Sequence, residues 1–175
     1  MRAVSFMVPI LLGVVLSGCH QYAPAKRCVG GQSNVEIRTQ LDDSSNAAVP
    51  LKHGDRLSGI LVSPGTLRID SIGLQIGNGG GTADGKLIIK ICQSGLCSTG
   101  EAQLAGSKDN DYLQFKLQKS LPVNYEEGPI QYELARDSGT KDVIVWTYPA
   151  FGKVTRLNIA GEDQARTVNL VFGQQ

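Results

Sequence analysis

Short segments in which apolar and polar residues alternate, separated by turn residues, run through almost the whole chain after residue 33. In one of them, Leu87, Ile89 and Ile91 alternate with Lys86 and Lys90. Successive side chains of a β-strand point to opposite faces of a sheet, so this pattern predicts strands with one buried face. No long stretch repeats its apolar residues at the helical period. The 21 glycines among 175 residues suit many tight turns. We therefore expect an all-β protein.

We expect about nine or ten strands of this kind. They cover residues 34–41, 57–62, 67–69, 72–76, 86–92, 112–117, 130–135, 142–148, 154–159 and 167–172. The alternation changes phase at Asp70 and Ser71, which predicts a β-bulge or a break between two strands. The glycine-rich residues 77–85 are expected to be a hairpin connection. Together these features predict an antiparallel β-sandwich of jelly-roll or immunoglobulin-like kind, with a closed barrel as the alternative.

The chain begins with a short apolar segment that is typical of a secretion signal. Arg2 provides a positive start, residues 3–16 are mainly apolar, and the small residues Ser17 and Gly18 follow. A membrane-spanning helix needs about 20 apolar residues, and this run is shorter. The segment therefore predicts a cleaved signal peptide over residues 1–18, with an uncleaved signal anchor as the alternative.

Residues 16–19, with the sequence LSGC, resemble the lipobox of bacterial lipoproteins. The resemblance implies a diacylglycerol on the Cys19 thiol, cleavage between Gly18 and Cys19, and acylation of the new amino group. In such proteins an Asp directly after the cysteine favours retention at the inner membrane, and this chain has His20 there. The resemblance therefore implies a lipid anchor in the outer membrane, with the protein facing the periplasm or the cell surface.

The rest of the chain is expected to be a tether followed by one domain. Residues 19–33 contain the lipidated cysteine and a short linker rich in Gly and Pro, and residues 34–175 are long enough for one β domain with a core. Two or more acyl chains hold a protein firmly to a bilayer, so the membrane is the expected partner of Cys19.

The charge of the expected mature chain is balanced. Removal of residues 1–18 takes away Arg2, so one of the 17 basic residues of the full sequence is lost and the remainder equals its 16 acidic residues. Nucleic acid binding requires a basic face, and the sequence contains no basic cluster that would form one. We therefore expect no nucleic acid partner.

The cysteines predict one disulfide bond. Cys92 and Cys97 flank four residues, a spacing that suits a hairpin. Opposed hairpin residues have Cα atoms about 4.5–5.5 Å apart, within the range that a disulfide needs. A redox or metal-binding pair is the alternative. Cys28 is left over, as a free thiol, an intermolecular bridge, or a partner in a different pairing.

The sequence offers no arrangement typical of a catalytic site. His53 lies in a polar turn without a nucleophile motif around it. The candidate carboxylates of a glycoside hydrolase, Glu101, Glu126, Glu127 and Glu133, lie in charged or alternating contexts that are typical of solvated surfaces. We therefore expect no enzyme activity and no cofactor.

Two other groups of residues are candidate binding sites. Asp109 and Asp111 flank Asn110, and oxygen-rich loops of this kind can hold Ca²⁺, although a plain turn is the favoured interpretation. The segment 142–148 carries Trp146 and Tyr148 on one face.

The opposite face of that segment carries Val143 and Val145. Large aromatic side chains dominate core energetics, so we expect the Trp146 face to be buried. If the Val face is buried instead, Trp146 and Tyr148 would form a platform that stacks on sugar rings. Tyr125, Tyr132 and Phe151 would extend that platform only if the fold brings them together.

Several segments of the mature chain are similar to jelly-roll accessory modules of bacterial envelope-glycan proteins. These segments are residues 83–87 (ADGKL), the Cys92–Cys97 hairpin, residues 109–110 (DN), residues 128–134 (GPIQYEL) and residues 143–149 (VIVWTYP). The resemblance implies a non-enzymatic module that binds envelope glycan or a protein partner. The alternatives are a structural or assembly subunit of an envelope complex, which recruits a partner through exposed strand edges, and a glycan hydrolase.

Overall fold

The computed structural model describes residues 35–39, 41–42 and 44–174. These residues form thirteen strands and one short 3-10 helix, η1 (Tyr125–Glu127). The strands are β1 (Val35–Arg38), β2 (Ala47–Leu51), β3 (Arg56–Leu61), β4 (Leu67–Gly77), β5 (Lys86–Gln93), β6 (Leu96–Gln103), β7 (Tyr112–Val123), β8 (Ile130–Ser138), β9 (Val143–Pro149), β10 (Arg156–Ile159), β11 (Glu162–Gln164), β12 (Arg166–Val168) and β13 (Leu170–Gln174). In this part of the chain no helix is long and apolar enough to cross a membrane. The predicted signal peptide, Cys19 and Cys28 lie outside the described residues.

The strands form one curled antiparallel sheet. Its main path runs β1-β13-β4-β7-β6-β5-β8-β3-β10-β11, and β9 pairs with β2, with β12 and with the end of β4. The long strand β4 therefore belongs to two parts of the sheet: it pairs with β13 and β7 along most of its length, and Ile76 lies opposite Val145 of β9. This sharing lets the sheet fold back over itself.

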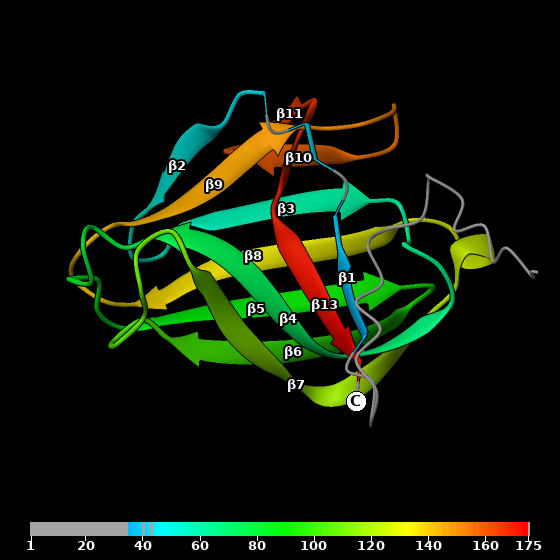
Figure 1. Ribbon diagram of the computed structural model, residues 1–175, viewed down its shortest axis with the longest axis horizontal. Helices are drawn as coiled ribbons and strands as arrows, with labels where there is room; N and C mark the ends of the chain where they lie inside the picture. The colour runs from blue at the N-terminus through cyan, green and yellow to red at the C-terminus, as the bar shows by residue number, and fades with distance from the viewer. Residues whose placement is uncertain (1–34, 40, 43, 175) are drawn as a thin grey trace, which may run out of the picture.

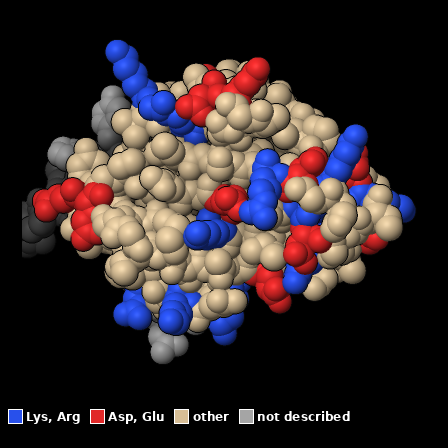
Figure 2. Space-filling model, turned by 180° about the vertical axis from the view of Figure 1, so that it is seen from behind, with Lys and Arg blue, Asp and Glu red and all other residues tan. Residues whose placement is uncertain are grey.

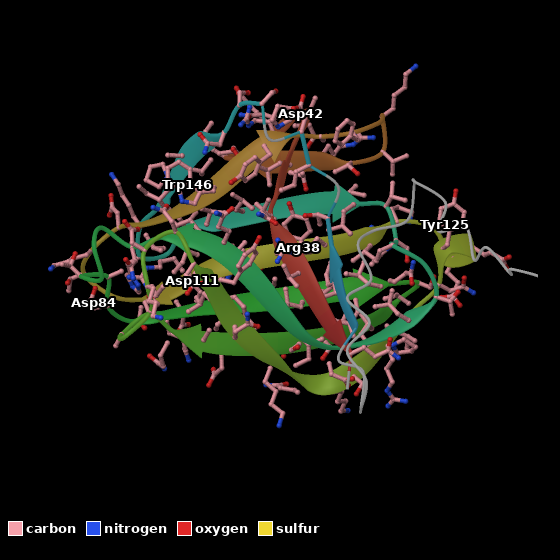
Figure 3. The ribbon with its side chains drawn as sticks, in the orientation of Figure 1. Arg38, Asp42, Asp84, Asp111, Tyr125 and Trp146 are labelled. Carbon is pink, nitrogen blue, oxygen red and sulfur yellow. A yellow bond between two sulfur atoms is a disulfide. The ribbon has the colours of Figure 1, made fainter. Side chains whose placement is uncertain are left out.

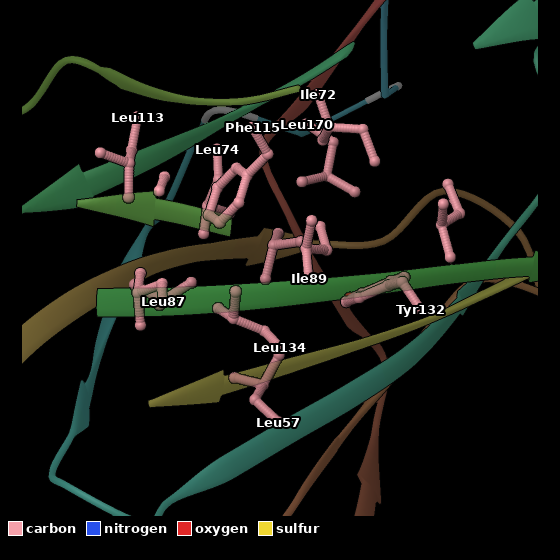
Figure 4. Packing of buried hydrophobic residues seen from close by; sticks show 14 of the residues in the cluster. Leu57, Ile72, Leu74, Leu87, Ile89, Leu113, Phe115, Tyr132, Leu134 and Leu170 are labelled. Atoms are coloured by element: carbon pink, nitrogen blue, oxygen red, sulfur yellow. The ribbon is translucent and has the colours of Figure 1, made fainter. Parts of the chain in front are cut away.

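The curl produces two layers with the core between them. In Figure 1, β4, β13 and β1 cross in front of β3, β8, β5 and β6. The front layer contributes Leu74 and Phe172 to the core, and the back layer contributes Ile89 and Leu134, all fully buried. Figure 4 shows Leu74 and Ile89 facing each other across this interior. The predicted antiparallel β-sandwich is confirmed.

Strand β4 contains the change of phase that the sequence predicted. Leu67 and Ile69 are buried in one phase, and Ile72 and Leu74 are buried in the other. Its pairing with β7 shifts register between Ile69 and Ser71, so the predicted bulge is confirmed. The bulge joins the two expected short strands into one.

The expected strands did not include β2 or β11, and for β6 only the hairpin at Cys92 and Cys97 was expected. Each of these three strands pairs with a neighbouring strand. One prediction about a connection is corrected. The glycine-rich loop is not a hairpin connection, because the β4 and β5 strands that it joins are separated in the sheet by β7 and β6. The loop instead carries the chain from one layer to the other.

Candidate ligand-binding site

Exposed apolar side chains gather at one end of the sandwich. The described residues include five large hydrophobic side chains that are exposed, namely Val62, Leu96, Tyr125, Phe151 and Val154. All five lie in or directly beside four connections at the right-hand end of Figure 1, here called the apolar end: residues 62–66, 94–95, 124–129 and 150–155. Seen from behind, most charged side chains lie away from this end (Figure 2). A gathering of this kind is typical of a binding surface.

The apolar end contains a cavity of about 330 Å³. Its apolar lining comes from three parts of the chain. They are Leu61 at the end of β3 with Val62 and Pro64 after it, Tyr125 of η1, and Phe151 and Phe172 from the C-terminal third. Leu61 and Phe172 are buried and form its floor, whereas Tyr125 (66% exposed) and Phe151 (54% exposed) form its rim. This volume suits a small ligand or one group of a larger one.

Three of the hydroxyl groups in the lining form hydrogen bonds within the fold. Thr39 Oγ1 donates to the carbonyl oxygen of Val168 at 3.2 Å, and Ser63 Oγ donates to that of Gly65 at 3.0 Å. The buried Thr167 donates to the carbonyl of Val168 at 3.3 Å. Because these donors already have acceptors, the interior of the cavity presents a mainly apolar wall to a ligand.

The η1 turn, which carries Tyr125, is fixed by hydrogen bonds from the side chain of Gln93. This side chain is 2% exposed. Its Nε2 donates to the carbonyl oxygens of Asn124 (2.8 Å) and Gly128 (2.6 Å), and its Oε1 accepts the backbone N–H of Asn124 at 2.7 Å. Ser94 Oγ adds a bond to the carbonyl of Glu127. The turn is therefore fixed although the Tyr125 ring is exposed, and a fixed ring loses less entropy when it binds.

The β5–β6 hairpin that supplies Gln93 is closed by the predicted disulfide. Cys92 lies opposite Cys97 in register, and their sulfur atoms form a bond of 2.10 Å. The two-residue turn uses Ser94 and Gly95, both with positive φ, as tight hairpins require. The Cys92–Cys97 prediction is confirmed.

Arg38 borders the cavity, but its charge is directed elsewhere. Its guanidinium carbon lies 5.4 Å from the centroid of the Tyr112 ring on β7, a cation–π contact on the outer face of the front layer. Figure 3 shows Arg38 in front of the sheet, well away from Tyr125. Among the described residues, no other one that lines the cavity is Lys, Arg, Asp or Glu.

The predicted orientation of the Trp146 face was wrong. Val143 and Val145 of β9 are fully buried, and Trp146 lies half-buried on the opposite, outer face. The indole Nε1–H donates to Asn110 Oδ1 at 2.8 Å, and a Cβ on Gly77 would lie only 3.2 Å from this nitrogen. Aliphatic valines fill the core without needing a hydrogen-bond partner, whereas the indole N–H finds its acceptor in an outer loop.

Tyr148 shares the outer face with Trp146 but is covered. It is 8% exposed, and its hydroxyl donates to Gln75 Oε1 at 2.7 Å. Asn169 Nδ2 donates to the same oxygen at 2.9 Å. Trp146 and Tyr148 therefore do not present two open rings, and neither lines the cavity.

The candidate cation ligands Asp109 and Asp111 bind backbone groups. Asp109 Oδ1 accepts the N–H of Asn78 at 2.7 Å, which helps to shape the glycine-rich loop, and Asp111 Oδ1 accepts the N–H of Tyr112 at 2.7 Å. Within the described ranges, no group of three or more His, Cys, Asp or Glu side chains is placed to hold a metal ion.

The opposite end of the sandwich is polar and is tied together by Asp84 and Arg136. Asp84 accepts the backbone N–H groups of Thr140 (2.9 Å) and Lys141 (3.1 Å). These bonds, that of Lys141 first, lower the pKa of Asp84 from 3.8 to about 2. Arg136 is fully buried; it donates to the carbonyls of Asp84 (2.5 Å) and Lys141 (3.0 Å), and burial lowers its pKa despite the nearby acidic groups.

Two of the glutamates considered as catalytic carboxylates form ion pairs. Glu133 pairs with Arg56, and Glu101 pairs with Lys86 at 3.1 Å. Glu126 and Glu127 are exposed on η1.

The sequence alone did not predict the cavity, and it singled out only some of the residues that line it. Tyr125 and Phe151 were expected only as extensions of a platform on β9, but they line the cavity at the apolar end, without Tyr132. One signal was available: both are aromatic residues in turn segments, NYEEG and PAFGK, where burial within a strand is not expected. Val62 and Thr155 carried no such signal.

A scan against protein-family models, a search of curated proteins and a search of solved structures each found no match for this chain.

Proposed function

We propose that this chain is a lipid-anchored, non-enzymatic binding module of the bacterial cell envelope, and that it binds its ligand at the apolar end. Cys19 carries the anchor, and the β-sandwich carries the site. The observation that supports the binding function most strongly is the cavity of about 330 Å³ whose rim exposes the rings of Tyr125 and Phe151. Exposing two aromatic rings to water is unfavourable unless a ligand covers them.

Envelope glycan is the ligand class that we propose for this rim. Sugar rings have an apolar face that stacks on aromatic side chains, and Tyr and Phe rings are rigid surfaces for such contacts. The hydrogen bonds of Gln93 hold the Tyr125 turn before any ligand arrives. The proposed contact rings are thus Tyr125 and Phe151 in place of Trp146 and Tyr148.

Binding of the full-length lipoprotein in lipid nanodiscs to an array of envelope glycans, peptidoglycan and exopolysaccharide tests this function. We expect binding that Tyr125→Ala and Phe151→Ala each weaken by about tenfold, because each ring is expected to contribute about 1–1.5 kcal/mol. Trp146→Ala is the matched control and should leave the affinity unchanged.

Three results would separate the possibilities. Loss of binding in Trp146→Ala alone would move the site to the outer face of β9. Capture of one defined envelope protein, dependent on Tyr125, would favour the assembly-subunit alternative. Absence of any glycan or protein ligand would contradict the proposed function.

A further inference from the structure

The floor and the rim of the cavity at the apolar end differ in chemistry. The floor is formed by buried residues such as Leu61 and Phe172, and the hydroxyls of Thr39, Ser63 and Thr167 beside it already donate to backbone carbonyls. A sugar ring that entered the floor would give up its hydrogen bonds to water and find few replacements, which is unfavourable. The floor therefore suits a group without polar atoms.

The rim, unlike the floor, combines exposed aromatic rings with polar groups. The exposed rings of Tyr125 and Phe151 stand beside polar and charged neighbours, including Asn124, Glu126 and Lys153. A polyhydroxylated group can stack on these rings while its hydroxyls stay in contact with water and with polar side chains. A ligand that satisfies both regions has one apolar part and one sugar part.

The charges near the cavity indicate which head group fits. Phosphate head groups are bound by clusters of Arg or Lys, but the residues that follow Tyr125 on η1 are the acidic Glu126 and Glu127. Arg38, the only charged residue in the described part of the lining, directs its guanidinium over Tyr112. The surroundings therefore favour an uncharged head group over a phosphate.

We propose that the ligand of this site is a glycolipid, whose alkyl chain enters the cavity while its uncharged sugar lies on the Tyr125 and Phe151 rings. This inference rests on the proposed glycan-binding function and narrows it, because a free polysaccharide would leave the apolar floor unfilled. Each methylene group buried in the cavity should strengthen binding by about fourfold. An alkyl chain is thus the main source of affinity, and the sugar is the source of selectivity.

Photo-crosslinking in living cells tests the proposal on the ligand that the cell itself supplies. The full-length protein is produced with Phe151→p-benzoylphenylalanine, and the cells are irradiated. The protein is then cleaved by a protease, so that the peptide containing residue 151 is separated from the acylated Cys19, and the mass added to this peptide is analysed by tandem mass spectrometry. We expect an adduct that contains both an alkyl chain and a sugar. Lys141→p-benzoylphenylalanine, at the polar end, is the matched control and should give no such adduct.

A second variant checks that the chain enters the cavity. Thr155 lines the cavity, so Thr155→Phe in the p-benzoylphenylalanine protein should reduce the yield of adduct by about fourfold for each methylene that it displaces. Thr155→Ser should leave the yield unchanged. Equal thermal unfolding of both variants would show that the loss comes from the cavity and not from misfolding.

The remaining outcomes distinguish this inference from the function on which it rests. An adduct with sugar but no alkyl chain would overturn the glycolipid proposal and leave glycan binding intact. An adduct with a phospholipid or a fatty acid would contradict the proposal that the ligand has a sugar head group. A protein adduct, or no adduct above that of the Lys141 control, would overturn both proposals.

Discussion

At the scale of single residues, Asp84 determines how the polar end responds to acid. Its carboxylate accepts two backbone N–H groups, and these lower its pKa from 3.8 to about 2. A carboxyl group with a lowered pKa binds its proton less readily in the folded state than in the unfolded chain. Its stabilising contribution is therefore present above about pH 4 and is lost as the pH falls towards about 2.

We expect Asp84→Asn to lower the free energy of unfolding at neutral pH and to flatten its decrease between about pH 4 and pH 2. Urea denaturation at several pH values measures both effects. Asp111→Asn, which also removes one negative charge at the polar end, is the control. If the free energy of unfolding of Asp84→Asn decreases with falling pH as in the unsubstituted protein, the hydrogen bonds of Asp84 to Thr140 and Lys141 do not stabilise the fold.

Gly59 is required by its neighbour across the sheet. It lies opposite Tyr132 of β8, and a Cβ at this position would overlap the buried Tyr132 ring. We expect Gly59→Ala to reduce stability by about 1–3 kcal/mol, because the buried ring and its neighbours in the core would have to shift. Thermal or chemical unfolding provides the measurement.

Gly73→Ala is the matched control for this prediction. A Cβ there would approach the end of the exposed Gln114 side chain, which can swing away into solvent. In a protein that already carries Tyr132→Leu, Gly59→Ala should reduce the free energy of unfolding by less. If Gly59→Ala and Gly73→Ala reduce the free energy of unfolding equally, the Tyr132 ring is not what makes a side chain at position 59 unfavourable.

At the scale of elements, η1 depends on a side chain from a different hairpin. Gln93→Ala would leave the backbone groups of Asn124 and Gly128 without their partners. We expect a loss of about 2 kcal/mol in stability and faster hydrogen exchange at the amides of Glu126 and Glu127. Gln114→Ala, an exposed glutamine, should change neither. Unchanged exchange in Gln93→Ala would mean that Ser94 and Asn124 hold the turn by themselves.

The strands also show which elements local patterns can predict. The regular alternation of β5 and the phase change within β4 were readable in the sequence, because burial on one face repeats every second residue. Of β6 only its start, in the Cys92–Cys97 hairpin, could be predicted from the sequence, and β2 could not be predicted. Their sequences, LCSTGEAQ and AAVPL, form strands because β5 and β9 offer them a paired edge, which is a tertiary effect.

At the scale of the whole molecule, the two ends of the sandwich have different compositions. The apolar end exposes aromatic and aliphatic side chains around a cavity, whereas the polar end contains Asp84 and the buried Arg136. Under the proposed function, a ligand with an apolar part would therefore bind at the apolar end and not at the polar end.

The proposed anchor is tested on the intact chain. We expect Cys19→Ser to abolish labelling with an alkyne fatty acid and to remove the protein from the outer-membrane fraction, because the acyl chains supply the binding free energy. Cys28→Ser should keep both properties. Labelling that persists in Cys19→Ser but disappears in Cys28→Ser would move the lipid to the other cysteine.

The sequence by itself determined the features that depend on near neighbours: the all-β class, the bulge beside Asp70, and the Cys92–Cys97 bridge. Only the tertiary structure decided that the valine face of β9 is buried, and that Tyr125 and Phe151 border one cavity. The physical reason is that alternation places residues on two faces without saying which face is buried. That choice follows from how β4, β9 and β13 pair across long separations in the chain.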